Sequence, residues 1–315
     1  MTDPDVTVRP LADGELHLFD TLVLDGPAFG PPGRDFLATA ADHHYRPEWT
    51  WVAQRGDRVV ARAAWWGGPD DAHPYALDWF DVGPDEDAVA VGARLLRAAH
   101  ESGAVQAADG TLAQYHLFLP PDPHLLPEVR PAVEERMAAA GQAGLRPFVE
   151  RLRFEWDPST GVPAPAGRLR FDPAPDDAAL LGLLERINVG TLDAHARRDL
   201  DRQGPAAAAR VQLEDMGWMP APRSWWRTAA TPDGDLVGLV MPSRNYQCAV
   251  IAYIGVVPEH RGRGYVDDLL AEGTAVLAAE GAELIRADTD ADNAPMAASF
   301  ARAGYRIVGR RIVMT

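Results

Sequence analysis

The stretch Ile251–Leu277, IAYIGVVPEHRGRGYVDDLLAEGTAVL, places a turn rich in glycine and arginine between an apolar run and an amphipathic helix. The turn is Arg261-Gly262-Arg263-Gly264. Glycine lets the backbone approach a ligand closely, and the first N–H groups of a helix have no partner within it. With charge-assisted donors from two arginines, this order of elements predicts a site for phosphate. The alternative is a tight strand-to-helix connection with solvated arginines.

The order Arg-x-x-Gly-x in this turn resembles the acetyl-CoA motif of the GNAT superfamily of N-acetyltransferases, Arg/Gln-x-x-Gly-x-Gly/Ala. It is not a P-loop, because no Gly-Lys-Ser/Thr follows, and it lacks the three glycines of a Rossmann fingerprint. Val266 departs from the small residue of the family, so we expect a slight shift of the helix start away from the pyrophosphate. The resemblance implies acetyl-CoA as co-substrate, with its pyrophosphate on backbone groups of Arg261, Gly262, Arg263, Gly264, Tyr265 and Val266.

The resemblance also implies where the thioester lies. In GNAT proteins the strand before the glycine turn splays from the next strand, so backbone N–H groups near Val256 and Val257 would polarise the thioester carbonyl. The stretch NAPMAASFARAGY resembles the family's Asn-x-x-Ala-x-x-Leu-Tyr-x-Lys-x-Gly-Phe segment, which would place Asn293 on the pantetheine arm. The tyrosine credited in the family with protonating the thiolate falls on Phe300. Phe300 has no proton to give, so another group or water does this, or transfer is slow or absent; Phe300 is otherwise a core aromatic.

Acetyl transfer also needs a group that takes the proton of the amine. Glu259 follows the central strand and is a candidate base, or a solvated carboxylate. Asp290, with Asp288, ends a predicted strand and either contacts the amine or caps the next helix. Tyr253 on the central strand orients substrate or packs. The single cysteine, Cys248, reads as buried with no histidine nearby in sequence, so we predict direct transfer instead of an acetyl-enzyme.

Composition restricts the cellular setting and the partners. A single cysteine forms no intrachain disulfide, the N-terminus lacks an apolar signal region, and no apolar run nears the roughly 18–20 residues of a membrane span. We therefore expect a cytoplasmic protein without a membrane partner. The sequence has no Cys/His cluster, and residues 288–292 lack the Gly and Glu of a calcium loop, so we expect no metal.

The net charge of −16 and the pI of about 4.9 disfavour nucleic acid as a partner. The same charge suits a cationic substrate such as an amine, or serves solubility alone. A homodimer is compatible with the sequence. Trp218, Trp225 and Trp226 cluster before the second strand of the C-terminal half, where they line a substrate pocket or belong to the core.

The elements that position these residues form two similar series, and a chain of 315 residues suggests two domains. Strands are predicted at 6–10, 49–54, 58–66, 75–82, 111–119, 148–156, 168–171, 224–230, 236–242, 249–257, 283–289 and 306–314. Helices are predicted at 13–24, 85–101, 131–143, 176–188, 205–216, 266–277 and 294–303. Both halves match the GNAT order of elements, separated by the Pro/Gly-rich linker DPSTGVPAPAG.

The predicted fold class is therefore α/β: two tandem GNAT-like domains at 1–157 and 168–315, each a mixed, mostly antiparallel sheet flanked by helices. The first domain carries Asp85, Glu86 and Asp87 where the phosphate turn would sit, so we expect only the second to bind acetyl-CoA. The predicted activity is acetyl-CoA-dependent N-acetyl transfer to the amine of a small molecule. The alternatives are a non-catalytic acyl-CoA-binding or regulatory module, and a protein acetyltransferase.

Overall fold

The computed structural model describes residues 5–315 except 86 and 108. These residues form two compact units. Unit 1 holds the described residues up to Glu150 together with Gly309–Thr315, and unit 2 holds Arg151–Val308. Each unit is a mixed sheet flanked by helices, which confirms the predicted fold class.

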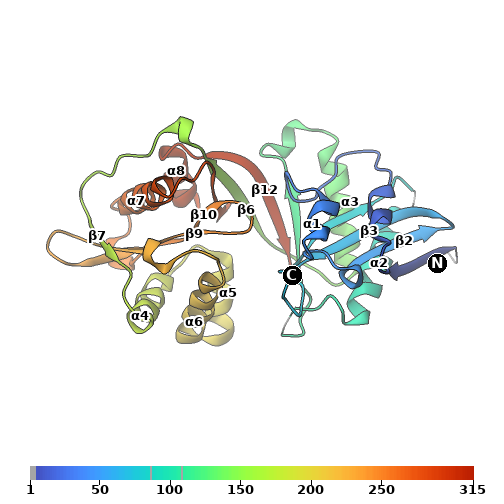
Figure 1. Ribbon diagram of the computed structural model, residues 1–315, viewed down its shortest axis with the longest axis horizontal. Helices are drawn as coiled ribbons and strands as arrows, with labels where there is room; N and C mark the ends of the chain where they lie inside the picture. The colour runs from blue at the N-terminus through green and yellow to red at the C-terminus, as the bar shows by residue number, and fades with distance from the viewer. Residues whose placement is uncertain (1–4, 86, 108) are drawn as a thin grey trace. The chain divides into compact units, whose positions relative to one another are not determined.

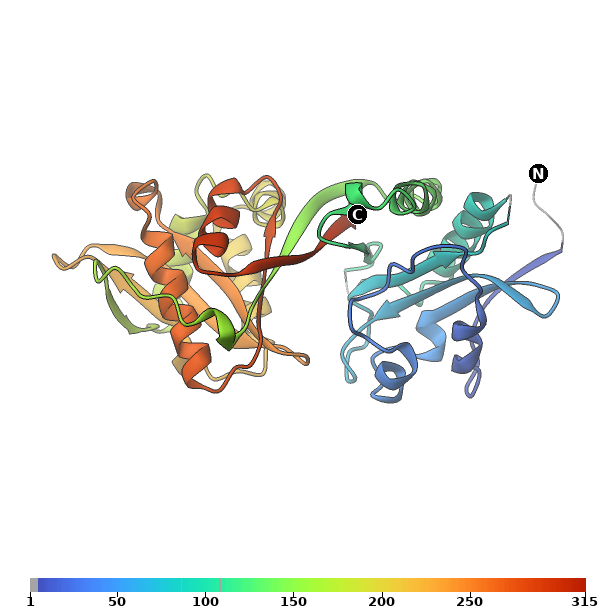
Figure 2. The ribbon, with the colours of Figure 1, turned by 90° about the horizontal axis from the view of Figure 1, so that it is seen from above.

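Unit 1 has a six-stranded sheet in which every neighbouring pair is antiparallel except β4 and β5, which are parallel. In sheet order its strands are β1 (Val6–Pro10), β2 (Thr50–Arg55), β3 (Arg58–Trp66), β4 (Ala76–Val82), β5 (Gln114–Leu119) and the last residues of β12 (Arg306–Met314). The 3-10 helix η1 (Leu16–Thr21) and α1 (Phe36–Ala41) lie on one face; α2 (Ala88–Ser102) and α3 (Val129–Gln142) lie on the other (Figure 2). Two short 3-10 helices, η2 (Pro47–Trp49) and η3 (Pro123–Leu125), complete the unit.

Unit 2 repeats this plan, with β10 and β11 as its parallel pair. In sheet order its strands are β6 (Pro147–Trp156, through residues 151–156), β11 (Ile285–Asp290), β10 (Ala249–Val256), β9 (Leu236–Arg244), β8 (Arg227–Ala230) and β7 (Arg170–Pro173). Helices α7 (Tyr265–Ala279) and α8 (Ala294–Arg302) cover one face, and α4 (Asp177–Asn188), α5 (Ala194–Gln203) and α6 (Pro205–Gly217) cover the other (Figure 1). Its 3-10 helices are η4 (Pro158–Thr160), η5 (Arg223–Trp225) and η6 (Pro258–His260).

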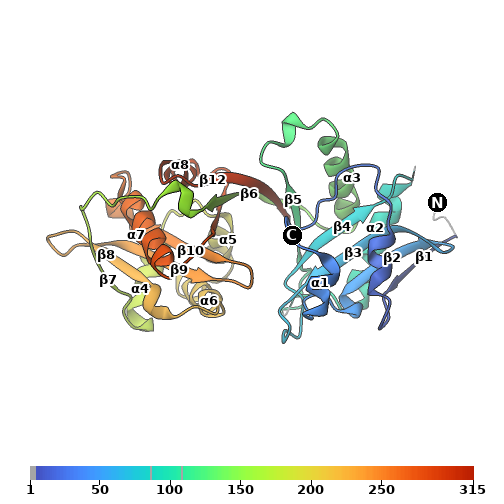
Figure 3. The same cartoon turned by 45° about the horizontal axis from the view of Figure 1, so that its top comes forward.

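Two helices of unit 2 show how the sequence produces this packing. Asp176 caps α4 by accepting a hydrogen bond from the N–H of Ala179, and an apolar stripe at helical spacing then faces the sheet. Helix α7 lies across β9 and β10, which run side by side beneath it (Figure 3). Gly273 permits this close contact, because a Cβ there would lie 2.8 Å from a methyl carbon of Val240.

The boundary between the units differs from the predicted linker. Residues 151–156 of β6 pair with β11 of unit 2, and residues 310–314 of β12 pair with β5 of unit 1. Each half of the chain thus contributes a strand to the unit built mainly from the other half. The order of elements along the chain cannot reveal this exchange, because strand pairing is decided in three dimensions.

Three elements also differ from the sequence prediction. The predicted helix at 13–24 is the six-residue 3-10 helix η1, and helices α1 and α5 were not predicted. Helix α5 has the sequence AHARRDLDRQ and buries only Ala194, so it lacks the apolar stripe that identifies a helix. Among the helices of the described chain, none is both long and apolar enough to pass through a membrane.

Candidate active site

A gap opens in the sheet of unit 2 where β10 and β11 separate. The two strands pair only at Ala249↔Ile285 and Val250↔Arg286, although β10 stays paired with β9 as far as Val256. The register shifts at Ala252, which marks a β-bulge, and bulges bend a strand and increase its twist. The splayed strands expected from the family resemblance are therefore present. We call the space between them the strand gap.

The backbone of β10 presents N–H groups to the strand gap. The N–H of Val257 donates to the carbonyl of Val237 at 2.9 Å and so faces β9. Successive N–H groups of a strand alternate between its two edges, so those of Val256 and Ile254 face away from β9, toward the gap. The N–H of Val256 thus faces the gap, whereas the N–H of Val257 is already bonded to Val237 and cannot polarise a thioester there.

The glycine turn leaves a series of backbone donors without partners. Gly262 and Gly264 have φ of 75° and 73°, the left-handed region that suits glycine, and α7 begins at Tyr265 directly afterwards. Across the described part of the chain, no acceptor is hydrogen-bonded to the N–H groups of residues 262–266. We call these five groups the N–H cradle.

An ion pair between Arg168 and a buried carboxylate lies behind the cradle and fixes its direction. Arg168 donates to the carbonyls of Arg263 at 2.9 Å and Gly264 at 2.8 Å, and it pairs with the buried carboxylate of Asp268. In a planar trans peptide the N–H and C=O point in opposite directions. The N–H groups of Gly264 and Tyr265 therefore point away from Arg168 and lie at the helix N-terminus, an arrangement that suits an anion.

The two arginines of the turn have different surroundings. The guanidinium of Arg261 is hydrogen-bonded to main-chain carbonyls and does not point at the N–H cradle. Its partners are the carbonyls of Val256 (3.0 Å), Ile187 (2.5 Å), Val189 (2.7 Å) and Gly190 (3.2 Å). Arg263 is exposed, and no hydrogen bond or ion pair of its guanidinium with the described residues is present. Only Arg263 therefore offers its charge to a phosphate.

The first turn of α7 carries two carboxylates, Asp267 and Asp268, that the sequence analysis did not consider as part of the site. An acidic side chain beside a bound pyrophosphate would oppose it, but both are neutralised by arginines of other elements. Asp268 pairs with Arg168, and Asp267 accepts hydrogen bonds from Arg302 at 2.7 Å and Ser299 at 2.6 Å. The arginines that neutralise these carboxylates are far from them in the sequence, so the sequence alone does not reveal the pairing.

Of the three candidate acid–base residues, Glu259 is the least suited. It is exposed and lies 3.4 Å from Arg186. A hydrogen bond with its own backbone N–H, assisted by Arg186, lowers the pKa of its carboxyl, so it remains ionised and solvated. A carboxylate with a lowered pKa is a weak base for an ammonium proton.

Asp290 lies at the end of β11, on the far edge of the strand gap from β10. Its Oδ2 accepts a hydrogen bond of 2.6 Å from the N–H of Ala194, and Arg151 lies 3.5 Å from its Oδ1. Burial, with repulsion from Asp193, raises the pKa of this carboxyl despite Arg151. A raised pKa beside a gap is the property of a candidate general base, although capping of α5 is the role the contacts show.

Tyr253 is the third candidate. Burial raises the pKa of its phenol well above the usual value, and its hydroxyl is hydrogen-bonded to the side chain of Gln212. The phenol is therefore neutral at physiological pH. It can donate a proton or orient a substrate, but it cannot act as a base.

The remaining candidates divide between capping and packing. Asn293 caps α8 through its Oδ1, which accepts from the N–H of Met296 at 3.4 Å. Asp288 accepts two hydrogen bonds from Arg153 on β6, at 3.0 and 3.2 Å, and so links the neighbouring strands β11 and β6. Burial raises the pKa of the Cys248 thiol, which keeps it protonated and unreactive.

Phe300 belongs to the core. It is 2% exposed, and its ring stacks on Phe154 with centroids 4.9 Å apart and leans on Tyr305 at 5.3 Å. The tyrosine hydroxyl nearby, that of Tyr305, is bound to Thr274 at 2.7 Å. Of the two readings of Phe300, the structure supports the core aromatic.

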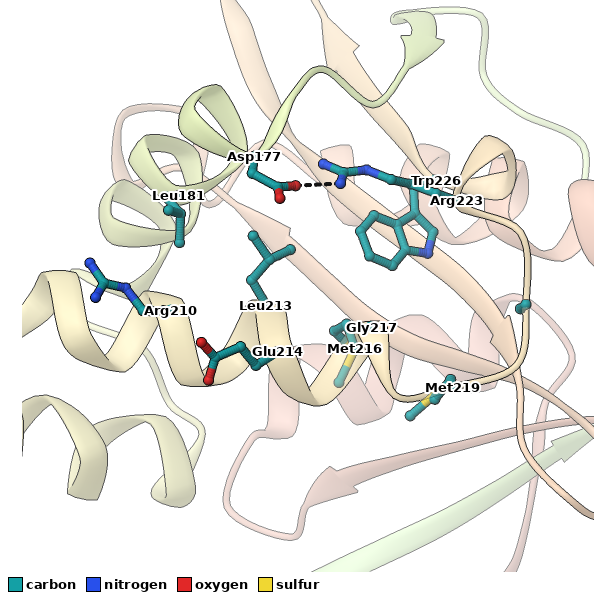
Figure 4. A pocket seen from close by; sticks show the side chains of 11 residues that line it. Asp177, Leu181, Arg210, Leu213, Glu214, Met216, Gly217, Met219, Arg223 and Trp226 are labelled. Atoms are coloured by element: carbon teal, nitrogen blue, oxygen red, sulfur yellow. Dashed lines mark ion pairs between the residues drawn. The ribbon is translucent and has the colours of Figure 1, made fainter. Parts of the chain in front are cut away.

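Unit 2 also has a pocket of about 530 Å³ at the other end of α4 (Figure 4). Trp226 lies along it beside Leu213, and Asp177 forms an ion pair with Arg223 at its rim. Trp225 packs partly buried against the core and Trp218 is exposed, so only one of the three tryptophans lines this pocket. Asp177, at the start of α4, lines this pocket, whereas Ile187, near the end of the same helix, lies beside the strand gap. The two residues are roughly 15 Å apart along the helix axis.

In unit 1 the strands β4 and β5 separate in the same way, but the side chain of Arg136 lies in the gap between them. Strands β4 and β5 pair at two positions only, and the N–H of Gly83 donates to Val60 at 2.8 Å, as Val257 does to Val237 in unit 2. Phe80 therefore occupies the position of Ile254. Its carbonyl accepts a hydrogen bond of 3.1 Å from Arg136, which is 3% exposed.

Among the described residues of the turn after β4, ion-paired carboxylates stand where unit 2 has the cradle. Asp85 forms ion pairs with Arg55 at 3.1 Å and Arg58 at 2.9 Å, and Asp87 pairs with Arg55 at 2.9 Å. Glu86, the third acidic residue of this turn, lies outside the described residues. The remaining two carboxylates are held by arginines of the sheet where unit 2 has free N–H groups.

Residues 194–305 match the acetyltransferase (GNAT) family. This part of the chain is a GNAT acetyltransferase domain. The match covers the splayed strands, the N–H cradle and α8, all of which lie in unit 2. Proteins of this family are acetyltransferases that use acetyl-CoA.

Solved structures share the fold over the whole chain. A GCN5-related N-acetyltransferase from Sphaerobacter thermophilus has 16% identity and a TM-score of 0.61, covering 100% of this chain and 96% of that one. A tandem GNAT protein from the clavulanic acid biosynthesis pathway has 21% identity and a TM-score of 0.50, covering 98% and 97%. A glucosamine N-acetyltransferase region of a fungal multi-domain β-N-acetylglucosaminidase has 15% identity and a TM-score of 0.56, covering 100% of this chain and 38% of that one. No curated protein matches this chain. At these identities the likeness establishes the fold alone.

Proposed function

We propose that the protein is an acetyl-CoA-dependent N-acetyltransferase that moves an acetyl group directly to the amine of a small molecule, at the strand gap of unit 2. The N–H cradle carries this proposal: consecutive unpaired N–H groups at a helix N-terminus form a site for a pyrophosphate. The adjacent strand gap provides room for an extended arm ending in a thioester.

The residues at the gap suit direct attack by the amine on the thioester carbon. The C–N bond forms as the carbonyl oxygen becomes negative, and the N–H of Val256 is placed to stabilise that charge. The intermediate then expels the CoA thiolate, and the ammonium proton passes to a base. Asp290 has the raised pKa that such a base requires, and water is the alternative. Because burial raises the pKa of the Cys248 thiol and keeps it protonated, Cys248 is not suited to form an acetyl-enzyme.

A single acetyl-CoA site per chain is part of this proposal. In unit 1 the gap holds Arg136, and the turn following β4 carries ion-paired carboxylates in place of a cradle. Unit 1 then has a structural role.

The test combines calorimetry with thiol release. Acetyl-CoA should bind with one site per chain, and free thiol should appear when primary amines are added. Binding without thiol release from any amine, while an acetyl-lysine signal appears on added proteins, would favour a protein acetyltransferase. Binding with neither product would favour an acyl-CoA-binding module, the reading that the buried position of Phe300 supports. An absence of binding would overturn all three.

A further inference from the structure

The segment 189–193, between α4 and α5, is fastened to both edges of the strand gap. We call it the α4–α5 loop. One end is held by Arg261, which bonds to the end of β10, and the other end by Asp290 at the end of β11. Because β10 and β11 have separated by this point, a loop fastened to both ends spans the mouth of the gap.

Arg261 makes the first attachment. Its Nε bonds to the carbonyl of Val256, and its other nitrogens bond to carbonyls of the last turn of α4 and of the loop, at Ile187, Val189 and Gly190. The last carbonyls of a helix have no partner within it, so a guanidinium there satisfies them and favours the negative end of the helix dipole. No ion pair of Arg261 occurs within the described residues, and its whole fork of donors serves the main chain.

Asp290 makes the second attachment. Its buried carboxylate accepts from the first N–H of α5, that of Ala194, at 2.6 Å. Asp193 caps the same helix by accepting from the N–H of Ala196 at 2.9 Å. The start of α5 is thereby fixed against the edge of the gap formed by β11.

The side chains on this loop combine apolar and acidic character. Val189 and Leu192 are 62% and 45% exposed, so neither contributes much to the core. Asp193 follows them with its side chain 36% exposed, and one of its oxygens lies 3.5 Å from Arg151. Exposed apolar side chains beside a carboxylate suit a ligand that joins an apolar group to a cation.

We propose that Arg261 is a positioning residue that sets the α4–α5 loop for the acceptor and does not bind phosphate, and that the acceptor is a primary amine carrying an apolar group. This rests on the proposed acetyl transfer at the strand gap. Lysine cannot replace Arg261, because a compact ammonium with three donors cannot reach carbonyls on two elements at once.

The first experiment compares Arg261→Gln and Arg261→Lys with the wild type. Arg186→Gln is the matched control, since Arg186 is an exposed arginine of the same helix end that contacts Glu259. We expect the Kd for acetyl-CoA to change by less than about threefold in both Arg261 variants, while the KM for benzylamine rises about tenfold or more, the size of effect expected when a positioning contact is lost. Amide hydrogen exchange of residues 187–194 should accelerate in these variants and not in the control.

The second experiment addresses the acceptor through exposed residues whose change leaves the fold intact. In the double variant Val189→Ser, Leu192→Ser, the ratio of kcat/KM for benzylamine to that for ethanolamine should fall about tenfold, the scale of discrimination by an apolar contact. The same ratio should stay at the wild-type value in Arg186→Gln.

The outcomes separate the two levels of inference. If wild-type protein binds no acetyl-CoA, or transfers to no amine, the proposed function fails, whereas hydrogen exchange still reports whether Arg261 holds the loop. If Arg261→Gln loses acetyl-CoA affinity as strongly as amine affinity with unchanged exchange at 187–194, Arg261 is a phosphate ligand and the inference is overturned. An unchanged amine preference in the double variant overturns the assignment of the acceptor.

Discussion

In unit 1 the guanidinium of Arg136 donates a hydrogen bond of 3.1 Å to the carbonyl of Phe80, inside the gap between β4 and β5. The same guanidinium pairs with the buried carboxylate of Asp81 at 2.8 Å. In unit 2 an arginine also binds a carbonyl of the corresponding strand, but at its end: Arg261 donates to the carbonyl of Val256 at 3.0 Å. The arginine of unit 1 thus reaches two residues further into the gap, to Phe80 of β4, whereas the arginine of unit 2 lies at the last residue of β10.

The first prediction concerns Arg136. Replacing it with methionine should destabilise the protein by about 3–5 kcal/mol, because Asp81 loses one of its two buried arginine partners. The number of acetyl-CoA sites should remain one, since the described residues of the turn after β4 present ion-paired carboxylates to a phosphate. Chemical denaturation and calorimetry measure the two quantities. Two sites in the wild type, or a second site in the variant, would show that unit 1 binds acetyl-CoA.

The second prediction concerns Gly264, whose φ of 73° is costly for a residue with a branched side chain. Gly264→Val should weaken acetyl-CoA binding about tenfold or more, since the left-handed conformation costs about 1–2 kcal/mol and its loss turns the cradle. A Cβ there would meet Arg168 only at 3.7 Å, so the strain comes from the backbone and not from a clash. Gly264→Asn is the control, because asparagine tolerates this conformation. Equal affinities for valine and glycine at 264 would mean that the pyrophosphate lies elsewhere.

The third prediction concerns Phe300. Phe300→Tyr should lower stability by about 1–3 kcal/mol, because the added hydroxyl is buried against Phe154 without a partner. The rate of thiol release per folded molecule should stay the same. Melting temperature and rate are measured together, and Tyr305→Phe serves as a control in which a paired hydroxyl is removed. A faster reaction without loss of stability would place Phe300 at the thioester.

The fourth prediction concerns pH and Asp290. Burial raises the pKa of its carboxyl above the unfolded value, so the native state binds the proton more tightly and stability falls as pH rises through the window from the unfolded to the folded pKa. Asp290→Asn keeps an oxygen for the N–H of Ala194 and removes the buried charge. It should therefore be at least as stable as wild type above this window, and the difference should disappear below it.

The same variant tests the base. If Asp290 takes the amine proton, kcat/KM rises with pH through its raised pKa in the wild type, and the Asn variant loses this limb with at least about a hundredfold lower rate. An unchanged pH profile in the variant would leave water as the base and Asp290 as a cap of α5.

Much of the fold followed from local patterns. The alternation of apolar residues, the turn residues and the caps predicted most strands and helices within a few positions, including the run from β10 through the glycine turn into α7. Helix α5 was not predicted because its ten residues include only two alanines and one leucine, too few for an apolar stripe. Its start has a local cap in Asp193, but the second hydrogen bond at this end comes from Asp290, a residue distant in sequence.

The sequence by itself determined the two series of elements, the glycine turn and the absence of a matching turn in the first half, because these depend on residue types at short spacing. Only the tertiary structure decided which strands pair and which donors remain free. The exchange of β6 and β12, the use of Val257 by Val237, and the placement of Phe300 in the core all arise from contacts between distant segments. The same holds for Arg261, whose side chain binds the end of α4 because the folded chain brings four carbonyls within its reach.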